Sequence, residues 1–286
     1  MNIYFDTKDL ISLFEILPLE EIDQFEEMLN RGNHNLVLSS INIIEISAPL
    51  LDKNAPTNVM RLLNRIEKMP CRFIAEAMIT KLELIEAGKA FVTTREYEQI
   101  SPFVNRFDET LSIDGPPPTS DYMSFGLAET VFTLWTEDPT LFENYPQHHE
   151  PLKEVFKKDR LISKKPKLRD HFTTTIERLI TISELTPKFE DIAAFAKWIY
   201  SKHTRCPSIR LGYETHHKIL KNIGDIPQKG DISDYAHISC TPYVDVITFD
   251  ARMINYVKQA SRDLVGSNYA KKICLNIDEV IERVGN

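Results

Sequence analysis

Two aspartates stand where short apolar runs of the chain stop. Asp6 follows the run at residues 2–5, and Asp250 comes shortly after the run VDVIT at residues 244–248. Runs of this length and composition predict buried β-strands. In open α/β sheets, ligands bind beyond the carboxyl ends of the strands. Both carboxylates are therefore candidates for a binding or catalytic site at that edge.

Three further acids lie on predicted helices beside such strands. Glu45 is on the helix that follows a predicted strand at residues 35–40. Asp231 and Asp234 open the short helix before the strand that leads to Asp250, three positions apart and hence on one helix face. The set that we expect to converge is Asp6, Glu45, Asp234 and Asp250, with Asp231 as the rival of Asp234.

Converging carboxylates would need a cation. Two ionised carboxylates about 5 Å apart repel each other by about 3 kcal/mol at an effective dielectric constant of 20. Oxygen ligands suit Mg²⁺ or Mn²⁺, and such an ion activates water and stabilises charge on a phosphoryl group. Each acid also has a structural alternative. Asp6, Asp231 and Asp250 stand where helix N-caps are expected, and Glu45 suits a solvated helix face.

The composition is that of an ordinary globular protein. Of 286 residues, 42% are hydrophobic and 27% are charged, with a net charge of −8. This charge argues against a uniformly basic nucleic-acid binder, although a local basic patch fits it. The four cysteines form no CxxC pair, so we expect reduced thiols in a cytoplasm. The sequence shows neither a signal-peptide pattern nor an apolar stretch long enough for a membrane span.

Short strands and helices alternate at both ends of the chain, whereas the middle is helical. Predicted strands cover residues 2–5, 35–40, 244–248 and 272–275. The predicted helices of the middle are 57–67, 72–89, 94–105, 122–136, 148–160, 168–186, 189–202 and 209–221. We therefore predict an α/β protein whose parallel-sheet domain, residues 1–53 and 223–286, is interrupted by a large all-helical insertion, residues 54–222.

Four segments carry the acids and their surrounding pattern. They read IYFDTKDLISL (3–13), LVLSSINIIEI (36–46), GDISDYAHISCTPYVDVITFD (230–250) and KICLNIDEVIERV (272–284). Together they resemble the PIN domain, a family of metal-dependent nucleases. Glu45 and Asp234 are 189 positions apart. This separation is far longer than in compact PIN toxins, and the insertion lies outside the resemblance.

The resemblance implies a role for each matching residue. In the family an aspartate ends the first strand, a serine-started helix carries an inward glutamate, another helix carries the third acid, and a strand ends in Thr-x-Asp. The matching residues here are Asp6, Ser40, Glu45, Asp234 (or Asp231), Thr248 and Asp250. The four acids would hold Mg²⁺ or Mn²⁺, and Thr248 would orient water or a neighbouring carboxylate.

The implied activity is hydrolysis of phosphodiester bonds, with RNA favoured over DNA as the substrate. The alternative is a catalytically silent PIN-like module that binds RNA or a protein partner through the helical insertion. A protein regulator and a homo-oligomer both fit the sequence. The biological role stays open between toxicity, phage defence and RNA processing.

Two basic stretches are candidate nucleic-acid surfaces. Residues 153–169 contain eight Lys or Arg and two acids, and residues 201–222 precede the acidic helix. Such cations can hold phosphates and steer a nucleic acid, although a solvated helix explains the same composition. The candidate residues are Lys157, Lys158, Arg160, Lys164, Lys165, Arg205 and Arg210. His237 fits a packed core histidine better than a phosphate contact.

Other hydrolase classes fit the sequence poorly. A haloacid-dehalogenase phosphatase needs a second aspartate two positions after the first, where this chain has Lys8. A serine hydrolase of the α/β type would show a G-x-S-x-G turn, and the sequence has none.

Overall fold

The computed structural model describes residues 1–48, 56–111, 126–137, 158–160, 168–187, 189–225 and 231–285. The N-terminal part alternates strands and helices as the sequence predicts. Its elements are β1 (Asn2–Tyr4), α1 (Thr7–Glu15), α2 (Leu19–Arg31), β2 (Asn35–Ser39) and α3 (Ser40–Ser47). Ser39 caps α3 and forms a capping box with Asn42, which fixes the turn from strand to helix.

The middle of the chain combines helices with two strands. Its elements are α4 (Pro56–Ile66), β3 (Cys71–Ile74), α5 (Glu76–Val92), β4 (Phe103–Val104), α6 (Leu127–Glu137), α9 (Leu168–Ile182), α10 (Ile192–Tyr200) and α11 (Pro207–Lys221). Four predicted helices are confirmed as α4, α9, α10 and α11. The predicted helix 122–136 is confirmed in its described part as α6, and most of 148–160 lies outside the described residues.

The C-terminal part returns to alternation. Its elements are α12 (Asp231–Cys240), β5 (Val246–Thr248), α13 (Ala251–Asp263), α14 (Tyr269–Lys272), β6 (Ile273–Cys274) and α15 (Ile277–Gly285). Among the described helices, none combines the length and the apolar character that crossing a membrane requires.

The six strands form one sheet in the order β4-β3-β2-β1-β5-β6. All neighbouring pairs are parallel except β3 with β4. The central strand β1 pairs with both ends of the chain, because Ile3 lies opposite Leu36 on one side and Val246 on the other. The α/β class and the joining of the two chain ends in one mostly parallel sheet are thus confirmed.

The prediction that residues 54–222 are all-helical is wrong. Strands β3 and β4 lie in this segment, and β3 pairs with β2 through Leu38 and Phe73. The predicted helix 72–89 is divided into β3 and α5, because CRFI (71–74) is a short run that periodicity assigns to either state. The predicted helix 94–105 is also wrong, because residues 95–102 form no helix. Pro102, just before β4, disfavours the helical conformation in the residue that precedes it.

Both faces of the sheet are covered by helices, and alternate strand residues feed two cores. Ile3, Leu36 and Val246 face a core shared with α1, α2, α3, α4, α6 and α15. Tyr4, Val37 and Ile247 face a core shared with α5, α11, α12, α13 and α14. Burial of the sheet on both faces is typical of parallel strands.

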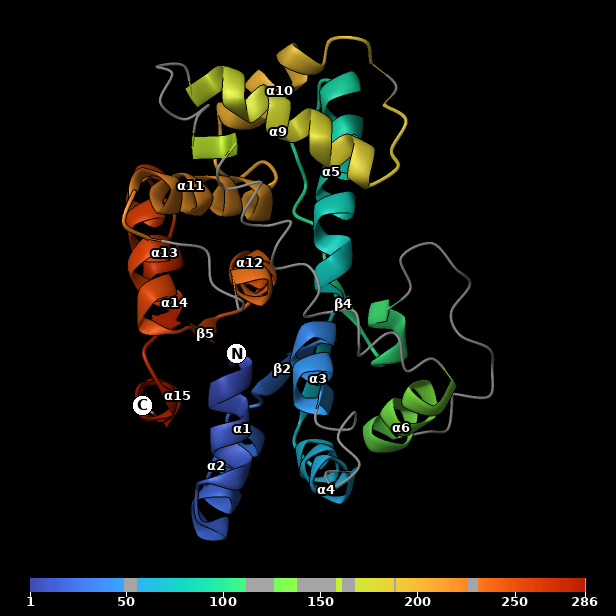
Figure 1. Ribbon diagram of the computed structural model, residues 1–286, viewed down its shortest axis with the longest axis vertical. Helices are drawn as coiled ribbons and strands as arrows, with labels where there is room; N and C mark the ends of the chain where they lie inside the picture. Colours follow the sequence, from blue (N-terminus) through green and yellow to red (C-terminus); the bar gives the residue numbers. More distant parts are fainter. Residues whose placement is uncertain are drawn as a thin grey trace.

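A third core lies beyond the sheet, where α9 and α10 pack on α5 and α11. Figure 1 shows α5 rising from the sheet to this group of helices. Glu83 of α5 is fully buried and accepts hydrogen bonds from the backbone N–H groups of Ser208 (2.8 Å) and Ile209 (3.1 Å) and from the hydroxyl of Tyr243. This carboxylate satisfies donors at the start of α11, and so joins the helical group to the sheet domain.

Candidate functional site

The order of the strands changes direction at β1, and the predicted acids lie beside this point. On one side of β1 lie β2 and then β3, and on the other side lie β5 and then β6. Such a switch point leaves a crevice at the carboxyl ends of the two central strands. Asp6 follows β1, and Thr248 ends β5. The backbone N–H of Asp6 donates to Oγ1 of Thr248 at 3.0 Å, which ties the two strand ends together.

Asp6 and Asp250 are both helix N-caps, which is the structural role that the sequence offered as an alternative to metal binding. Oδ1 of Asp6 accepts from the backbone N–H of Asp9 (2.8 Å), and Oδ1 of Asp250 accepts from that of Met253 (2.6 Å). Each cap uses one carboxylate oxygen. Burial raises the pKa of Asp6 and the negative charge of Asp250 raises it further, while the hydrogen bond from Asp9 and the charge of His237 oppose the shift. The two carboxylates therefore interact across the crevice.

Glu45 enters the site from α3 and is held in its ionised form. Its carboxylate accepts a hydrogen bond from the hydroxyl of Thr7, and its Oε2 lies 3.5 Å from Nε2 of His237. Burial raises the pKa of Glu45, but the contacts with His237 and Thr7 outweigh burial and leave the pKa below its ordinary value. Glu45 is thus not on a solvated helix face.

Asp234 is the most perturbed acid of the site. Burial and the negative charge of Asp250 raise its pKa to about 7, although His237 favours the ionised form. Near neutral pH its carboxyl group is therefore close to half protonated. A group that exchanges a proton in this range has the property expected of an acid–base residue.

Asp231 has a different environment from Asp234, although both lie in the first turn of α12. Its fully buried carboxylate binds Nη1 and Nη2 of Arg252, which also binds Asp225 through Nε at 3.0 Å. These hydrogen bonds hold the pKa of the Arg252 guanidinium above its ordinary value against the effect of burial. The carboxylate of Asp231 is occupied by this ion pair, whereas Asp234 interacts with Asp250.

The structure adds two acids that the sequence did not single out. Burial and the charge of Asp6 raise the pKa of Asp9 to about 6, and the Asp9 carboxylate hydrogen-bonds Thr248. Glu76 is buried at the end of β3 and accepts from the backbone N–H of Ser40 (3.1 Å) and from its hydroxyl. Asp9 lies three positions after Asp6, a spacing that could have indicated it. Glu76 had no such signal, because it follows an unpredicted strand.

His237 is the core histidine that the sequence favoured, and it also contacts the site. It is 3% exposed, and its Nδ1 lies 2.6 Å from the hydroxyl of Tyr4, which in turn lies 2.7 Å from Oγ of Ser39. Its other ring nitrogen faces Glu45. This chain of contacts fixes the imidazole beside the carboxylates and orients Glu45 from the far side.

The donor chemistry of the site suits a hard divalent cation, but the oxygens are not gathered around a single point. Asp6, Asp9 and Asp234 all have raised pKa values, and each is raised in part by the charge of a neighbouring carboxylate. A cation would relieve this repulsion. Within the described ranges, no group of three or more His, Cys, Asp or Glu is arranged so that it could hold a metal ion. Coordination would therefore require side-chain rotation.

Arg210 and Arg205, two candidates for the basic surface, are held by neighbouring side chains. Arg210 is only 5% exposed and binds Glu214 at 3.2 Å, with its guanidinium 3.9 Å from the ring centre of Tyr200. Arg205 stacks on Trp198 at 3.9 Å and donates to the carbonyl oxygen of that residue. Aromatic rings of the helical group hold both guanidinium groups, so neither extends freely from an exposed basic surface.

The other basic candidates fall near residues 158–160 or outside the described ranges. Lys158 is exposed. Arg160 donates to the backbone carbonyl groups of Asn222 (3.2 Å) and Asp225, beside the Asp225–Arg252 ion pair. Lys157, Lys164 and Lys165 lie outside the described residues.

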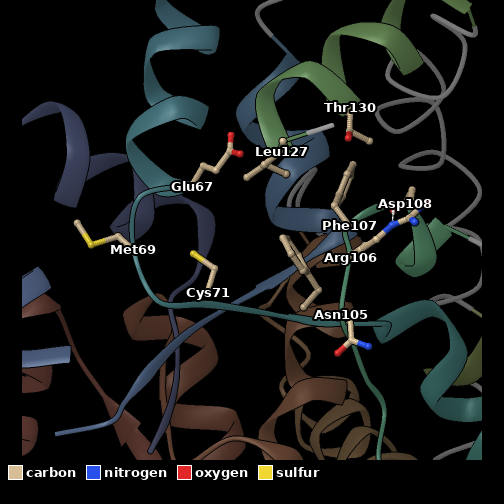
Figure 2. Close-up of a pocket in the computed structure, with 11 residues that line it drawn as sticks. Glu67, Met69, Cys71, Asn105, Arg106, Phe107, Asp108, Leu127 and Thr130 are labelled. Atoms are coloured by element: carbon tan, nitrogen blue, oxygen red, sulfur yellow. Dashed lines mark hydrogen bonds and ion pairs between the residues drawn. The ribbon is translucent and has the colours of Figure 1, made fainter. Parts of the chain in front are cut away.

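A separate hollow of about 260 Å³ lies beside α4 and α6, away from the acids. Figure 2 shows Arg106 turned toward Asp108, to which it is hydrogen-bonded, with Cys71 and Met69 across the hollow. Burial raises the pKa of the Cys71 thiol to about 12, which makes it a poor nucleophile. This hollow therefore offers less chemistry than the crevice at the strand ends.

Comparisons of the chain with protein-family models, with curated proteins and with solved structures found no match.

Proposed function

We propose that the protein is a PIN-like nuclease that hydrolyses phosphodiester bonds with Mg²⁺ or Mn²⁺, and that RNA is its preferred substrate. The observation that carries the proposal is that the charge of Asp250 raises the pKa of both Asp6 and Asp234, beside the carboxyl ends of β1 and β5. Their repulsion destabilises the folded chain unless a cation or a proton offsets it. Glu45 completes the four acids of the PIN pattern.

Each residue has a distinct part in the proposed reaction. When bound, the metal ion would supply Lewis acidity to the phosphoryl oxygens and make a water molecule more acidic. Asp6, Asp250, Asp234 and Glu45 would hold it. Thr248 fixes the backbone of Asp6 and the carboxylate of Asp9, and His237 fixes Glu45. Asp234 would give up its proton when the cation binds, because a neighbouring positive charge favours the ionised carboxylate.

The test is cleavage of labelled single-stranded RNA and DNA in Mn²⁺, Mg²⁺ or EDTA. We expect metal-dependent cutting that Asp250→Asn reduces by orders of magnitude. Asparagine remains a good N-cap, so this variant should keep α13 and its stability. The matched control is Asp245→Asn, because Asp245 precedes β5 but, among the described residues, its side chain accepts only from the backbone N–H of Asn2 (2.7 Å) at the protein surface. Equal cutting by Asp250→Asn and wild type would refute the proposal.

A silent binding module is the second candidate. It is favoured by the cap hydrogen bonds of Asp6 and Asp250 and by the absence of a closed metal-ligand set within the described ranges. A binding module would cut none of the substrates, and Mn²⁺ would leave its melting temperature unchanged. It would also bind RNA or a protein partner equally well after Asp250→Asn.

A further inference from the structure

A second cleft lies at the far end of α13 from Asp250. It has a volume of about 970 Å³ and is bordered by residues 200–204, by α11 and by residues 262–265. Helix α13 has 13 residues, so the cleft is about 18 Å along the helix from the acids, at a rise of about 1.5 Å per residue. Its basic lining residues are Lys202, His203, Arg210, His217, Lys221 and Arg262.

Arg210 brings buried hydrogen-bond donors to this cleft. Its side chain contacts Glu214 through Nη2, and its guanidinium lies over the ring of Tyr200. Nε and Nη1 are buried and have no hydrogen-bond partner within the residues that the structure describes. A buried charged group whose donors lack acceptors costs free energy in the folded chain. A ligand with acceptor oxygens would remove that cost.

His217 repeats this pattern on the next turns of α11. It is 5% exposed, and its Nε2 has no hydrogen-bond partner in the described part of the chain. Burial and the positive charges of Lys221 and Lys218 lower the pKa of His217 to about 4. Burial is the main reason that the imidazole is neutral, and the nearby lysines add to the effect; the same positive charges attract an anion.

The acids near the cleft are already in contact with cations. Glu214 is bound by Arg210, and Asp263 is bound by Lys218. Lys202 is bound by Glu96 at 3.3 Å. Lys221 and Arg262 add two exposed positive charges at the cleft. The cleft thus combines a positive rim with buried, unpaired donors.

We propose that this cleft binds a phosphate-bearing ligand. The Nε and Nη1 groups of Arg210 would each donate a charge-assisted hydrogen bond to a phosphate oxygen. A volume near 970 Å³ accommodates a nucleotide as well as a single phosphate group. The phosphate would belong either to a free nucleotide or to a nucleic-acid strand. The site is separate from the acids, so it does not depend on nuclease activity.

The test is calorimetric titration of the whole protein in EDTA with inorganic phosphate, with ATP and with a short single-stranded RNA. EDTA prevents phosphate from binding through a metal at the acidic site. We expect phosphate or ATP to bind wild type, and Arg210→Met and Lys221→Met to weaken binding by about tenfold or more. Tighter binding of ATP than of the RNA per phosphate would indicate a free nucleotide, and the reverse would indicate a strand.

Two controls separate ligand binding from loss of structure. Arg205→Met removes a guanidinium that is stacked on an aromatic ring in the same way but does not line the cleft, and should bind phosphate as wild type does. Lys221→Met and Arg262→Met change exposed residues and should preserve the fold if Arg210→Met does not. NMR titration of His217 should show a higher pKa with phosphate. The proposal is overturned if wild type binds none of the three ligands or if the cleft variants bind all three normally.

Discussion

Replacement of Asp234 by asparagine should stabilise the protein at alkaline pH. Asp234 has a pKa of about 7 in the folded chain, raised from 3.8 by burial and by Asp250. Between these two values the folded chain holds a proton that the unfolded chain has released. The free energy of unfolding therefore falls as the pH rises from about 4 to 7, and the full destabilisation is present above pH 7.

The size of the effect follows from the two pKa values. Their difference corresponds to about 4 kcal/mol. Asp234 is only partly buried, so solvent screening reduces this value, and we expect about 2 kcal/mol at pH 8. For a chain of this length that is a rise in melting temperature of about 3 °C. At pH 4 the difference between Asp234→Asn and wild type should be close to zero.

The assay is thermal unfolding of both proteins in EDTA at several pH values from 4 to 8. Asp231→Asn is the matched control, because it lies in the same helical turn but removes a partner of Arg252. It should lower the melting temperature at pH 8. A lower melting temperature for Asp234→Asn at pH 8, or a gain that does not fade toward pH 4, would refute the electrostatic reasoning. If the acids hold a metal, Mn²⁺ should also raise the melting temperature of wild type more than that of Asp234→Asn.

Three further substitutions test other parts of the structure. Arg252→Met should destabilise the chain by about 3 kcal/mol or more in denaturant unfolding, because it leaves Asp231 buried and without its cation. Tyr243→Phe should lower the free energy of unfolding by about 1–2 kcal/mol, because it removes a hydrogen bond to Glu83. The loss should be larger at pH 8 than at pH 6, because Glu83 has a pKa of about 7 and accepts stronger hydrogen bonds when it is ionised. Leu63→Ala should lower the free energy of unfolding by about 2–5 kcal/mol and leave RNA cutting unchanged, because Leu63 is fully buried in the core on the opposite side of the sheet from α12. An equal loss of stability and specific activity would contradict the separation of core and site.

The strands that could be predicted from the sequence are those that are followed directly by an amphipathic helix. Tyr4, Val37 and Ile247 belong to short apolar runs whose residues alternate between two cores, and such runs are visible in the sequence. Residues 71–74 gave no such signal, because one four-residue run before a 17-residue helix has too few positions to show a period. Pairing with β2 decides its conformation, and that contact is not local.

The same limit applies to the site. Asp6 and Asp250 were found because they follow predictable strands, and Glu76 was missed because it follows β3. The choice between Asp231 and Asp234 depends on Arg252, which lies in another helix and takes the carboxylate of Asp231. Arg205 and Arg210 were named as candidate nucleic-acid contacts because their stretch of the sequence is basic, whereas Trp198 and Tyr200 of the preceding helix stack on them.

The pairing of β1 with β5 has a consequence for synthesis of the chain. Ile3 lies opposite Val246, so β1 has one neighbour missing until more than 240 residues have been made. A nascent chain that has reached α11 contains Asp6 and Glu45 but lacks Thr248, Asp234 and Asp250. The acidic site therefore forms only late in translation, after the helical group has emerged from the ribosome. Chains released early would carry half of the acids, an unpaired strand edge and no complete site.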